Sequence, residues 1–268
     1  IGFMGDPHAI TPHLDTFANE GVVYNRAYTT AGVCAPVRSA VITGVYQSSL
    51  GTQHMRSAAH LPDHIQLFPF YLRQAGYYTS NNSKTDYQLP KGEPALKGVW
   101  DDSSGNGHWR NRPDSDQPFF AVFNFGGTHE SGIESDSKYR DVTANLTAAE
   151  RQDPLALTTY PPYYPETTNA RENWKRNYEL ITAMDAWAGD LIQQLKNDGL
   201  YENTVIFFWS DHGIGLPRGK RWLYESGTHI PLAVRVPAAY RTPGQITPGT
   251  INRQLISSID FAPTVLNL

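Results

Sequence analysis

Cysteine is nearly absent from this sequence: Cys34 is the only one among 268 residues, so no disulfide can form within the chain. No run of 18 apolar residues occurs either, which excludes an ordinary membrane-spanning helix. The chain also lacks a basic excess, and its formal net charge of −4 argues against general nucleic-acid binding. An anionic small substrate stays compatible, because a local cluster of lysine, arginine and histidine can make one pocket positive.

What the chain does contain is enough apolar material for a core, with 40% hydrophobic and 18% charged residues. Helical patterns alternate with short apolar runs. Helices are predicted for residues 12–20, 36–42, 64–75, 169–198 and 258–267, and strands for residues 22–27, 77–80, 119–125, 204–213 and 231–237. This alternation predicts an α/β fold with a mainly parallel, mixed central sheet and helices on both faces.

Several polar residues follow the predicted strands directly. Asp211 and His212 end one apolar run, His129 follows another, and Cys34 lies in a strand-to-helix connection. Sites in such sheets form beyond the carboxyl ends of the strands. We therefore expect these residues to converge on one edge of the sheet.

Two segments, residues 81–118 and 130–168, are rich in Pro, Asn, Asp, Ser and Tyr. They are predicted to be long loops over the sheet edge, where specificity commonly resides. Their aromatic side chains could stack on sugar rings, although aromatic loops more commonly pack on the core.

The surroundings of Cys34 set it apart from an ordinary buried cysteine. A lone cysteine is most simply a small buried hydrophobe. Here it comes just before the predicted helix that starts near Pro36, and a helix N-terminus favours an anion. Arg38 adds positive charge one turn along. The pattern indicates a place for an anion.

The stretch 34-CAPVR-38, continued by Ile42-Thr43-Gly44, resembles the C-x-P-x-R signature of the type I sulfatases, which belong to the alkaline-phosphatase-like superfamily. The family usually has leucine where this chain has Ile42. Further segments resemble the family in the same order along the chain: residues 10–30, 207–213, 220–237 and 257–268. The resemblance implies the superfamily's α/β core and sulfatase activity.

The resemblance also implies a covalent modification. Cys34 would be oxidised to formylglycine by a formylglycine-generating or anaerobic sulfatase-maturating enzyme. Hydrated formylglycine supplies a gem-diol, in which one hydroxyl attacks the sulfur of a sulfate monoester and the other later expels sulfate. A plain cysteine cannot perform the second step.

Four further catalytic residues are implied by the family motifs. Arg38 would hold the diol or stabilise its oxyanion, and Lys84 and Lys220 would contact the sulfate. His129 would bind the sulfate or protonate the leaving oxygen, which a histidine can do near neutral pH. Asp86 departs from the family, since it stands where the K-x-H motif has its histidine. Asp86 is expected to orient Lys84 or to contact a sugar hydroxyl.

The implied metal is Ca²⁺, with Asp211, His212 and the modified Cys34 among its ligands. The family places two more acidic ligands on a strand just before the segment that starts at Ile1. Asp6 is a poor substitute, because its Gly-Asp-Pro setting is typical of a turn. Residues 1–268 are therefore expected to be a sulfatase catalytic core without its first strand and its C-terminal subdomain, and to bind metal weakly.

The expected substrate is a sulfated carbohydrate, with His54, Arg56, Asp86 and His229 lining its pocket. A structural role for His54 and Arg56 is an equal alternative. A periplasmic or secreted location is expected, although the sequence shows no signal peptide.

Three other functions remain open on the sequence. A phosphate or phosphonate monoester hydrolase of the same superfamily would share the Cys34 motif. A non-catalytic relative would keep the fold and bind glycans. A hydrolase that uses Cys34 as a thiolate is disfavoured, because it would need a histidine base that the family matches assign elsewhere.

Overall fold

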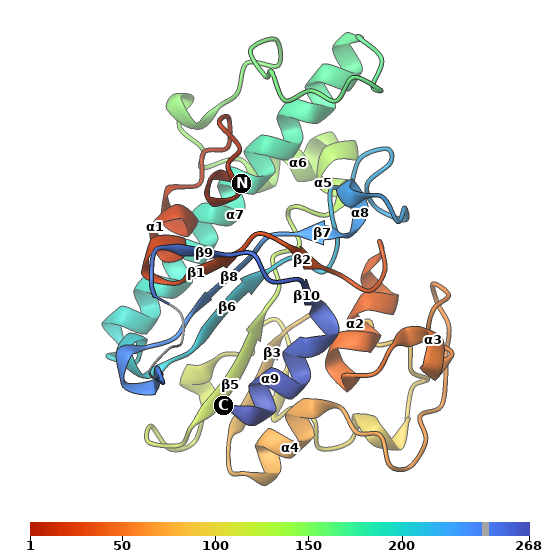
Figure 1. Cartoon of the computed structure of the whole chain (residues 1–268), viewed down its shortest axis with the longest axis vertical. Helices are drawn as coiled ribbons and strands as arrows, with labels where there is room; N and C mark the ends of the chain where they lie inside the picture. Colours follow the sequence, from red (N-terminus) through yellow and green to blue (C-terminus); the bar gives the residue numbers. More distant parts are fainter. Residues whose placement is uncertain (243–246) are drawn as a thin grey trace. The chain divides into compact units, whose positions relative to one another are not determined.

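The computed structural model describes residues 1–242 and 247–268. The chain forms two compact units, each assembled from separate stretches of sequence (Figure 1). The first unit contains residues 1–26, 125–210 and 231–254, and the second contains residues 27–124, 211–230 and 255–268. Helices and sheets are mixed in both, which confirms the predicted α/β class. No helix of the described residues is long and apolar enough to cross a membrane.

The first unit contains a four-stranded sheet in the order β6-β8-β1-β9. β1 runs parallel to β9 and antiparallel to β8, and β8 runs antiparallel to β6. This sheet is therefore mixed rather than mainly parallel. Its strands are β1 (Val22–Tyr24), β6 (Ile206–Trp209), β8 (Leu232–Arg235) and β9 (Thr250–Asn252). The helices of this unit are α1 (Pro12–Glu20), α5 (Glu130–Glu134), α6 (Asp136–Val142) and α7 (Thr168–Asn197), with 3-10 turns at Gly2–Met4, Ala148–Glu150, Tyr201–Asn203 and Ala238–Tyr240.

The helix α1 begins and ends where the sequence predicts. Thr11 is its N-cap residue, Pro12 opens the first turn and Gly21 follows the last. Phe17 and Ala18 are buried in one cluster with Val23 and Ala233. The apolar face of α1 therefore fastens this helix to the sheet of the first unit.

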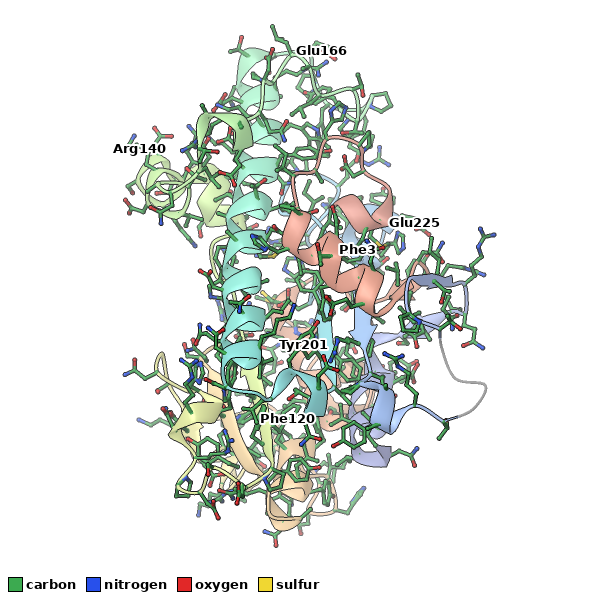
Figure 2. The ribbon with its side chains drawn as sticks, turned by 90° about the vertical axis from the view of Figure 1, so that its left-hand side faces the viewer. Phe3, Phe120, Arg140, Glu166, Tyr201 and Glu225 are labelled. Atoms are coloured by element: carbon green, nitrogen blue, oxygen red, sulfur yellow. The ribbon has the colours of Figure 1, made fainter. Side chains whose placement is uncertain are left out.

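The long helix α7 is anchored by Glu179, which is fully buried. Figure 2 shows α7 along its length, with Glu166 near its start and Tyr201 just beyond its end. The Glu179 carboxylate accepts hydrogen bonds from the Tyr139 hydroxyl, from Arg151 Nη1 at 2.9 Å and from the Gln152 backbone N–H at 3.0 Å. A buried carboxylate held in this way ties α6, through Tyr139, and the segment at Arg151 and Gln152 to α7.

The second unit contains two three-stranded sheets, ordered β10-β2-β7 and β4-β3-β5. In the second of these, β3 runs parallel to both neighbours. The strands are β2 (Ala27–Tyr28), β3 (Tyr78–Asn82), β4 (Asp102–Ser103), β5 (Phe119–Phe123), β7 (His229–Ile230) and β10 (Ile256–Ser257). The helices are α2 (Cys34–Thr43), α3 (Gln47–Leu50), α4 (Phe68–Gln74), α8 (Glu225–Thr228) and α9 (Phe261–Asn267), with 3-10 turns at Pro94–Leu96, Trp109–Asn111 and Ser258–Asp260.

Several predicted boundaries were wrong. The helix expected from residue 64 starts only at Phe68, and Pro69 lies in its first turn, where the missing N–H costs nothing. The strand expected over 22–27 is split into β1 and β2, because a turn occupies residues 25–26. The strands β5 and β6 are half-buried rather than buried. The segment 130–168 is not all loop, since it contains α5 and α6.

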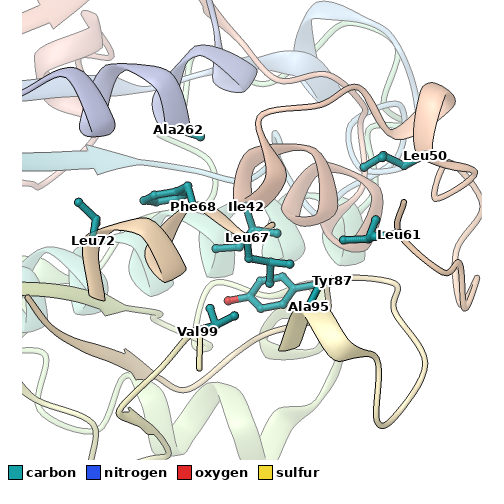
Figure 3. Packing of buried hydrophobic residues seen from close by; sticks show 10 residues of the cluster. All are labelled: Ile42, Leu50, Leu61, Leu67, Phe68, Leu72, Tyr87, Ala95, Val99 and Ala262. Carbon is teal, nitrogen blue, oxygen red and sulfur yellow. The ribbon is translucent and has the colours of Figure 1, made fainter. Parts of the chain in front are cut away.

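The second unit has its own apolar core (Figure 3). Leu67, just before α4, is fully buried at the centre of this core, and Ala262 of α9 packs at one side of it. The buried members of the cluster are Ile42, Leu50, Leu61, Leu67, Phe68, Leu72, Tyr87, Ala95, Val99 and Ala262. Because Ile42 belongs to α2, this core also fixes the helix that starts at Cys34.

We expect Leu67→Ala to lower the free energy of unfolding by about 2–5 kcal/mol, because it removes buried methyl groups and leaves a cavity. Urea denaturation followed by circular dichroism measures the loss. Leu255→Ala is the matched control, because Leu255 is 67% exposed. A loss at Leu67 no larger than at Leu255 would contradict this packing.

The stabilisation from Glu179 is expected to depend on pH. Burial raises the pKa of this carboxyl, but the hydrogen bonds from Tyr139, Gln152 and Arg151 and the charge of Lys175 lower it more, so the pKa lies below its ordinary value of 4.5. A lowered pKa contributes stability above about pH 4.5 that is lost as the pH falls through the folded-state value.

Glu179→Gln should therefore cost about 3 kcal/mol of unfolding free energy at neutral pH, and less as the solution becomes acidic. Urea denaturation of both proteins from neutral to acidic pH measures this. A difference that stays constant or grows toward acidic pH would show that the carboxylate charge is not what stabilises this unit.

Candidate active site

Cys34 is the first residue of α2, not the residue before the helix as the sequence suggested. Val33 is the N-cap residue and is extended, without a side-chain cap. Cys34 is only 5% exposed. The sulfur therefore lies in the first helical turn, where backbone N–H groups lack intrahelical partners and an anion is favoured.

The helix α2 is held at both its middle and its end. Ser39 Oγ donates to Thr52 Oγ1 at 2.8 Å within the buried interior. Gly44 ends the helix with φ +67°, and a Cβ there would come within 3.3 Å of the Ala262 Cβ. The left-handed conformation and the close approach both favour glycine. The helix formed by 34-CAPVRSAVITG-44 is therefore fixed at its middle and at its C-terminal end.

Arg38 is held mainly by backbone carbonyls. Its Nε donates to the Thr85 oxygen at 2.9 Å and its Nη2 to the Lys84 oxygen at 2.5 Å. Nη1 lies 3.8 Å from Asp211 Oδ2. The Arg38 side chain is only 10% exposed. The predicted catalytic arginine thus has one defined position, one helical turn beyond Cys34.

Asp211 lies close to positively charged side chains of the site. Lys84 Nζ lies 3.5 Å from its Oδ2, and Thr29 Oγ1 donates to its backbone oxygen at 3.0 Å. Burial raises the pKa of the Asp211 carboxyl, but the charges of His212, Lys84 and Arg38 lower it more, and the net pKa is below its ordinary value. Asp211 is therefore an ionised carboxylate at neutral pH.

His212 is oriented by its own neighbour. Its Nδ1 lies 2.8 Å from the Gly213 carbonyl oxygen, which can only accept, so Nδ1 carries the proton. Nε2 lies 3.7 Å from Asp211 Oδ1. A second hydrogen bond of this type is the usual way in which a metal-binding histidine is positioned.

Cys34, Asp211 and His212 each place one ligand atom within 4.8 Å of the others. The sulfur stands in for the oxygen that formylglycine would present. Three donors are fewer than the six to eight oxygens that Ca²⁺ takes, and an imidazole is not its usual ligand. The described residues therefore offer part of a divalent-cation site and fit a complete calcium site poorly.

The neighbours of Cys34 change the pKa of its thiol. Burial raises its pKa, but the hydrogen bond with His212 and the charges of Lys84 and Lys220 together lower it more, so the net pKa is below the ordinary value. Lys220 itself is buried, at 5% exposed, and its backbone N–H donates to the Ile214 oxygen at 2.7 Å. The surroundings of residue 34 therefore favour negative charge, as the sequence predicts for an anion site.

The predicted pocket residues form local contacts of their own. Asp86 Oδ1 accepts from Arg56 Nη1 at 3.2 Å and so contacts this arginine rather than orienting Lys84. His54 and Arg56 are both exposed. His229 stacks on Tyr28 with ring centroids 5.1 Å apart.

His129 belongs to the first unit, where it is the N-cap residue of α5. The Ser131 backbone N–H donates to its Nδ1 at 3.2 Å. The proton of the neutral ring therefore lies on Nε2, the atom that would donate to a leaving oxygen.

Sequence reasoning missed Asn81, which is fully buried in β3. Its Nδ2 donates to the Lys84 oxygen at 3.3 Å and to Ser103 Oγ at 3.1 Å, and its Oδ1 accepts from Asn124 Nδ2 at 3.1 Å. Asn81 therefore positions the backbone that holds Arg38. Asn81 is the first residue of the predicted loop 81–118, whereas β3 continues to Asn82.

A model of the Sulfatase family matches residues 1–268. The chain belongs to the sulfatase family. It is 41% identical to an ulvan-active sulfatase of Formosa agariphila, covering 99% of this chain and 49% of that protein. It is 26% identical to the human N-sulphoglucosamine sulphohydrolase, covering 96% of this chain and 55% of the other. The sulfatase chain thus spans about half the length of these curated relatives.

Solved structures share the sulfatase chain's fold. A Bacteroides thetaiotaomicron protein studied in the metabolism of multiple glycosaminoglycans aligns with a TM-score of 0.72 at 22% identity, covering 98% of this chain and 65% of that one. The phosphonate monoester hydrolase of Agrobacterium radiobacter gives 0.72 at 19% identity, covering 100% and 70%. At these identities the likeness shows a shared fold and supports no particular substrate.

We expect His212→Ala to raise the pKa of the Cys34 thiol, because it removes the hydrogen bond that stabilises the thiolate. The rate of thiol alkylation is measured against pH by mass spectrometry, with the protein kept in buffer that contains a chelator. The signal comes from Cys34 alone, because the chain has no other cysteine. His60→Ala is the matched control, since this histidine pairs with Glu93 at 2.8 Å. If the pKa of the Cys34 thiol is the same in His212→Ala as in the unaltered protein, His212 does not stabilise the thiolate.

Proposed function

We propose that residues 1–268 form the catalytic core of a sulfatase that hydrolyses sulfate monoesters on a sulfated carbohydrate. The observation that carries this proposal is the position of Cys34. It begins a buried helix, within 4.8 Å of Asp211 and His212, and the charges of Lys84 and Lys220 act on it. Family membership supports the same reaction class.

Each side chain has a task in this proposal. Once matured to formylglycine, residue 34 supplies the hydroxyl that attacks sulfur. Arg38 and Lys84 stabilise the negative charge that develops on the sulfuryl oxygens, and buried Lys220 adds to the field. Positive groups fixed before the reaction cost no reorganisation during it. For His129 the family motif alone supports a role as the acid for the leaving oxygen, with Nε2 as the donor atom.

The proposal includes a maturating enzyme and a divalent metal. Oxidation of Cys34 needs an external oxidant, which a formylglycine-generating or anaerobic sulfatase-maturating enzyme supplies. We propose Ca²⁺ as the metal, with Asp211 and His212 as two of its ligands; such a site would need further oxygen ligands. His54, Arg56, Asp86 and His229 are proposed to line the substrate pocket.

For the substrate we propose a sulfated polysaccharide of the ulvan type, because the relative with 41% identity is an ulvan-active sulfatase. A periplasmic or secreted location follows from such a substrate. Phosphate and phosphonate monoesters are the alternative substrates, and the ratio of their turnover rates to that of a sulfate ester separates the two reactions.

Maturation of Cys34 is expected in the native host. Trypsin releases residues 27–38, and formylglycine lowers the mass of this peptide by about 18 Da relative to cysteine. Mass spectrometry of protein from the native host measures the mass of this peptide. Cys34→Ala protein, which cannot form formylglycine, is the control. An unmodified thiol there would rule out the proposed nucleophile and favour a non-catalytic glycan-binding protein.

Arg38→Ala is expected to lower kcat for sulfate release by about 10²–10³-fold, because it removes a fixed donor from the developing charge. The assay measures sulfate released from ulvan oligosaccharides by matured enzyme. Arg140→Ala, an exposed arginine of α6, is the control and should retain full activity. Equal kcat values in the two variants would exclude Arg38 from the reaction.

A further inference from the structure

The segment that follows Lys220 exposes three consecutive apolar side chains. Trp222 is 53% exposed, Leu223 79% and Tyr224 47%. Large apolar side chains side by side on a surface mark a binding site more often than single ones do. No catalytic task falls to these three residues, and they lie two to four positions beyond the buried Lys220.

The rings of Trp222 and Tyr224 are nearly parallel. Their centroids are 5.9 Å apart and their planes differ by 16°. The guanidinium of Arg218 lies over the Tyr224 ring, 4.6 Å from its centroid. Aromatic faces carry negative partial charge, which attracts the guanidinium and also the C–H face of a sugar ring.

The backbone beneath these rings is fixed. The Trp222 N–H donates to the Gly219 oxygen at 3.0 Å, and the Gly227 N–H donates to the Tyr224 oxygen at 2.8 Å. A Cβ at Gly227 would come within 2.1 Å of the Trp222 carbonyl oxygen. A rigid backbone that presents aromatic rings loses little conformational entropy on binding.

The same backbone is joined to the segment that leads into Cys34. The Arg221 N–H donates to the Gly32 oxygen at 2.6 Å. Gly32 is buried, and a Cβ there would come within 2.3 Å of the Trp222 oxygen. The segment that carries the rings is therefore hydrogen-bonded to residue 32, two positions before Cys34 in the chain.

We propose that Trp222 and Tyr224, with Arg218 beside them, form a second carbohydrate subsite that stacks on one pyranose ring of a sulfated glycan. The inference rests on the proposed function for its choice of ligand. The charge agrees with that choice, because Arg218 and Arg221 are both exposed beside the rings and the glycan is anionic. The positive charge of the Arg218 guanidinium attracts an anionic group such as sulfate or carboxylate.

The test measures binding without turnover. Unmatured protein, with Cys34 as the thiol, is titrated with ulvan tetrasaccharides by isothermal titration calorimetry. Trp222→Ala should weaken binding about tenfold, the scale of one lost stacking contact. Tyr71→Ala is the matched control, since Tyr71 is a 45% exposed aromatic residue of α4 and should leave binding unchanged. Circular dichroism of each variant shows that it is folded.

A second variant tests the charge. Arg218→Gln should weaken binding of the sulfated tetrasaccharide more than that of its desulfated counterpart, because only the former carries the anion. Equal affinity of Trp222→Ala and the unaltered protein would overturn the proposal, as would failure of the unaltered protein to bind the tetrasaccharide. Self-association that Trp222→Ala abolishes would also overturn it, because the rings would then be an interface between copies.

The result is independent of catalysis. Failure of the proposed sulfatase reaction appears as an unshifted Cys34 peptide or as absent sulfate release. Failure of the subsite appears in the binding and self-association measurements on unmatured protein, which involve no sulfate release.

Discussion

The ion pairing of Asp211 organises the site of the second unit. A partly buried carboxylate needs positive partners, and Lys84 and Arg38 provide them at 3.5 and 3.8 Å. These two cations come from a loop and from α2, so the carboxylate draws separate segments together around the N-terminus of the helix. The cations that hold Asp211 are also the groups that an anionic substrate would meet. The same cations therefore stabilise the partly buried carboxylate and make the site complementary in charge to an anion.

The site depends on backbone geometry as much as on side chains. Buried Asn81 supports the Lys84 carbonyl, which in turn accepts from Arg38. Gly32 lets the Trp222 backbone approach the segment before Cys34. Such contacts allow polar groups to stay buried because each has a partner. The result is a helix N-terminus enclosed by short loops whose positions are fixed by hydrogen bonds.

Local signals in the sequence predicted much of this architecture. The Thr11-Pro12 start and the Gly21 end of α1 were predicted because capping depends on neighbouring residues only. The extent of α7 followed from its long amphipathic pattern. Burial of the apolar runs at β5 and β6 was not predictable, because it depends on what covers each face. The split of residues 22–27 depends on separate pairing partners, which no local pattern contains.

The site was predicted by residue type more fully than by geometry. The motif pointed to Cys34, Arg38, Lys84, Asp211 and His212, and the structure brings these five side chains together in one unit. The partner of Asp86 was not predictable, since Arg56 is 30 positions away in the chain. Asn81 was missed because it lies just after the predicted strand 77–80, and its burial depends on partners that no local pattern contains. Assignment of the His212 tautomer likewise needed the Gly213 carbonyl in place.

The way in which Arg38 is held has an evolutionary consequence. Two of its hydrogen bonds go to the carbonyl oxygens of residues 84 and 85, and every amino acid carries such an oxygen. Side chains in this loop can therefore change without removing these two anchors of the arginine. Divergence from K-x-H to Lys84-Thr85-Asp86 is a change of this kind. The side chains of this loop can therefore vary while the positive charge of Arg38 keeps its position beside Asp211.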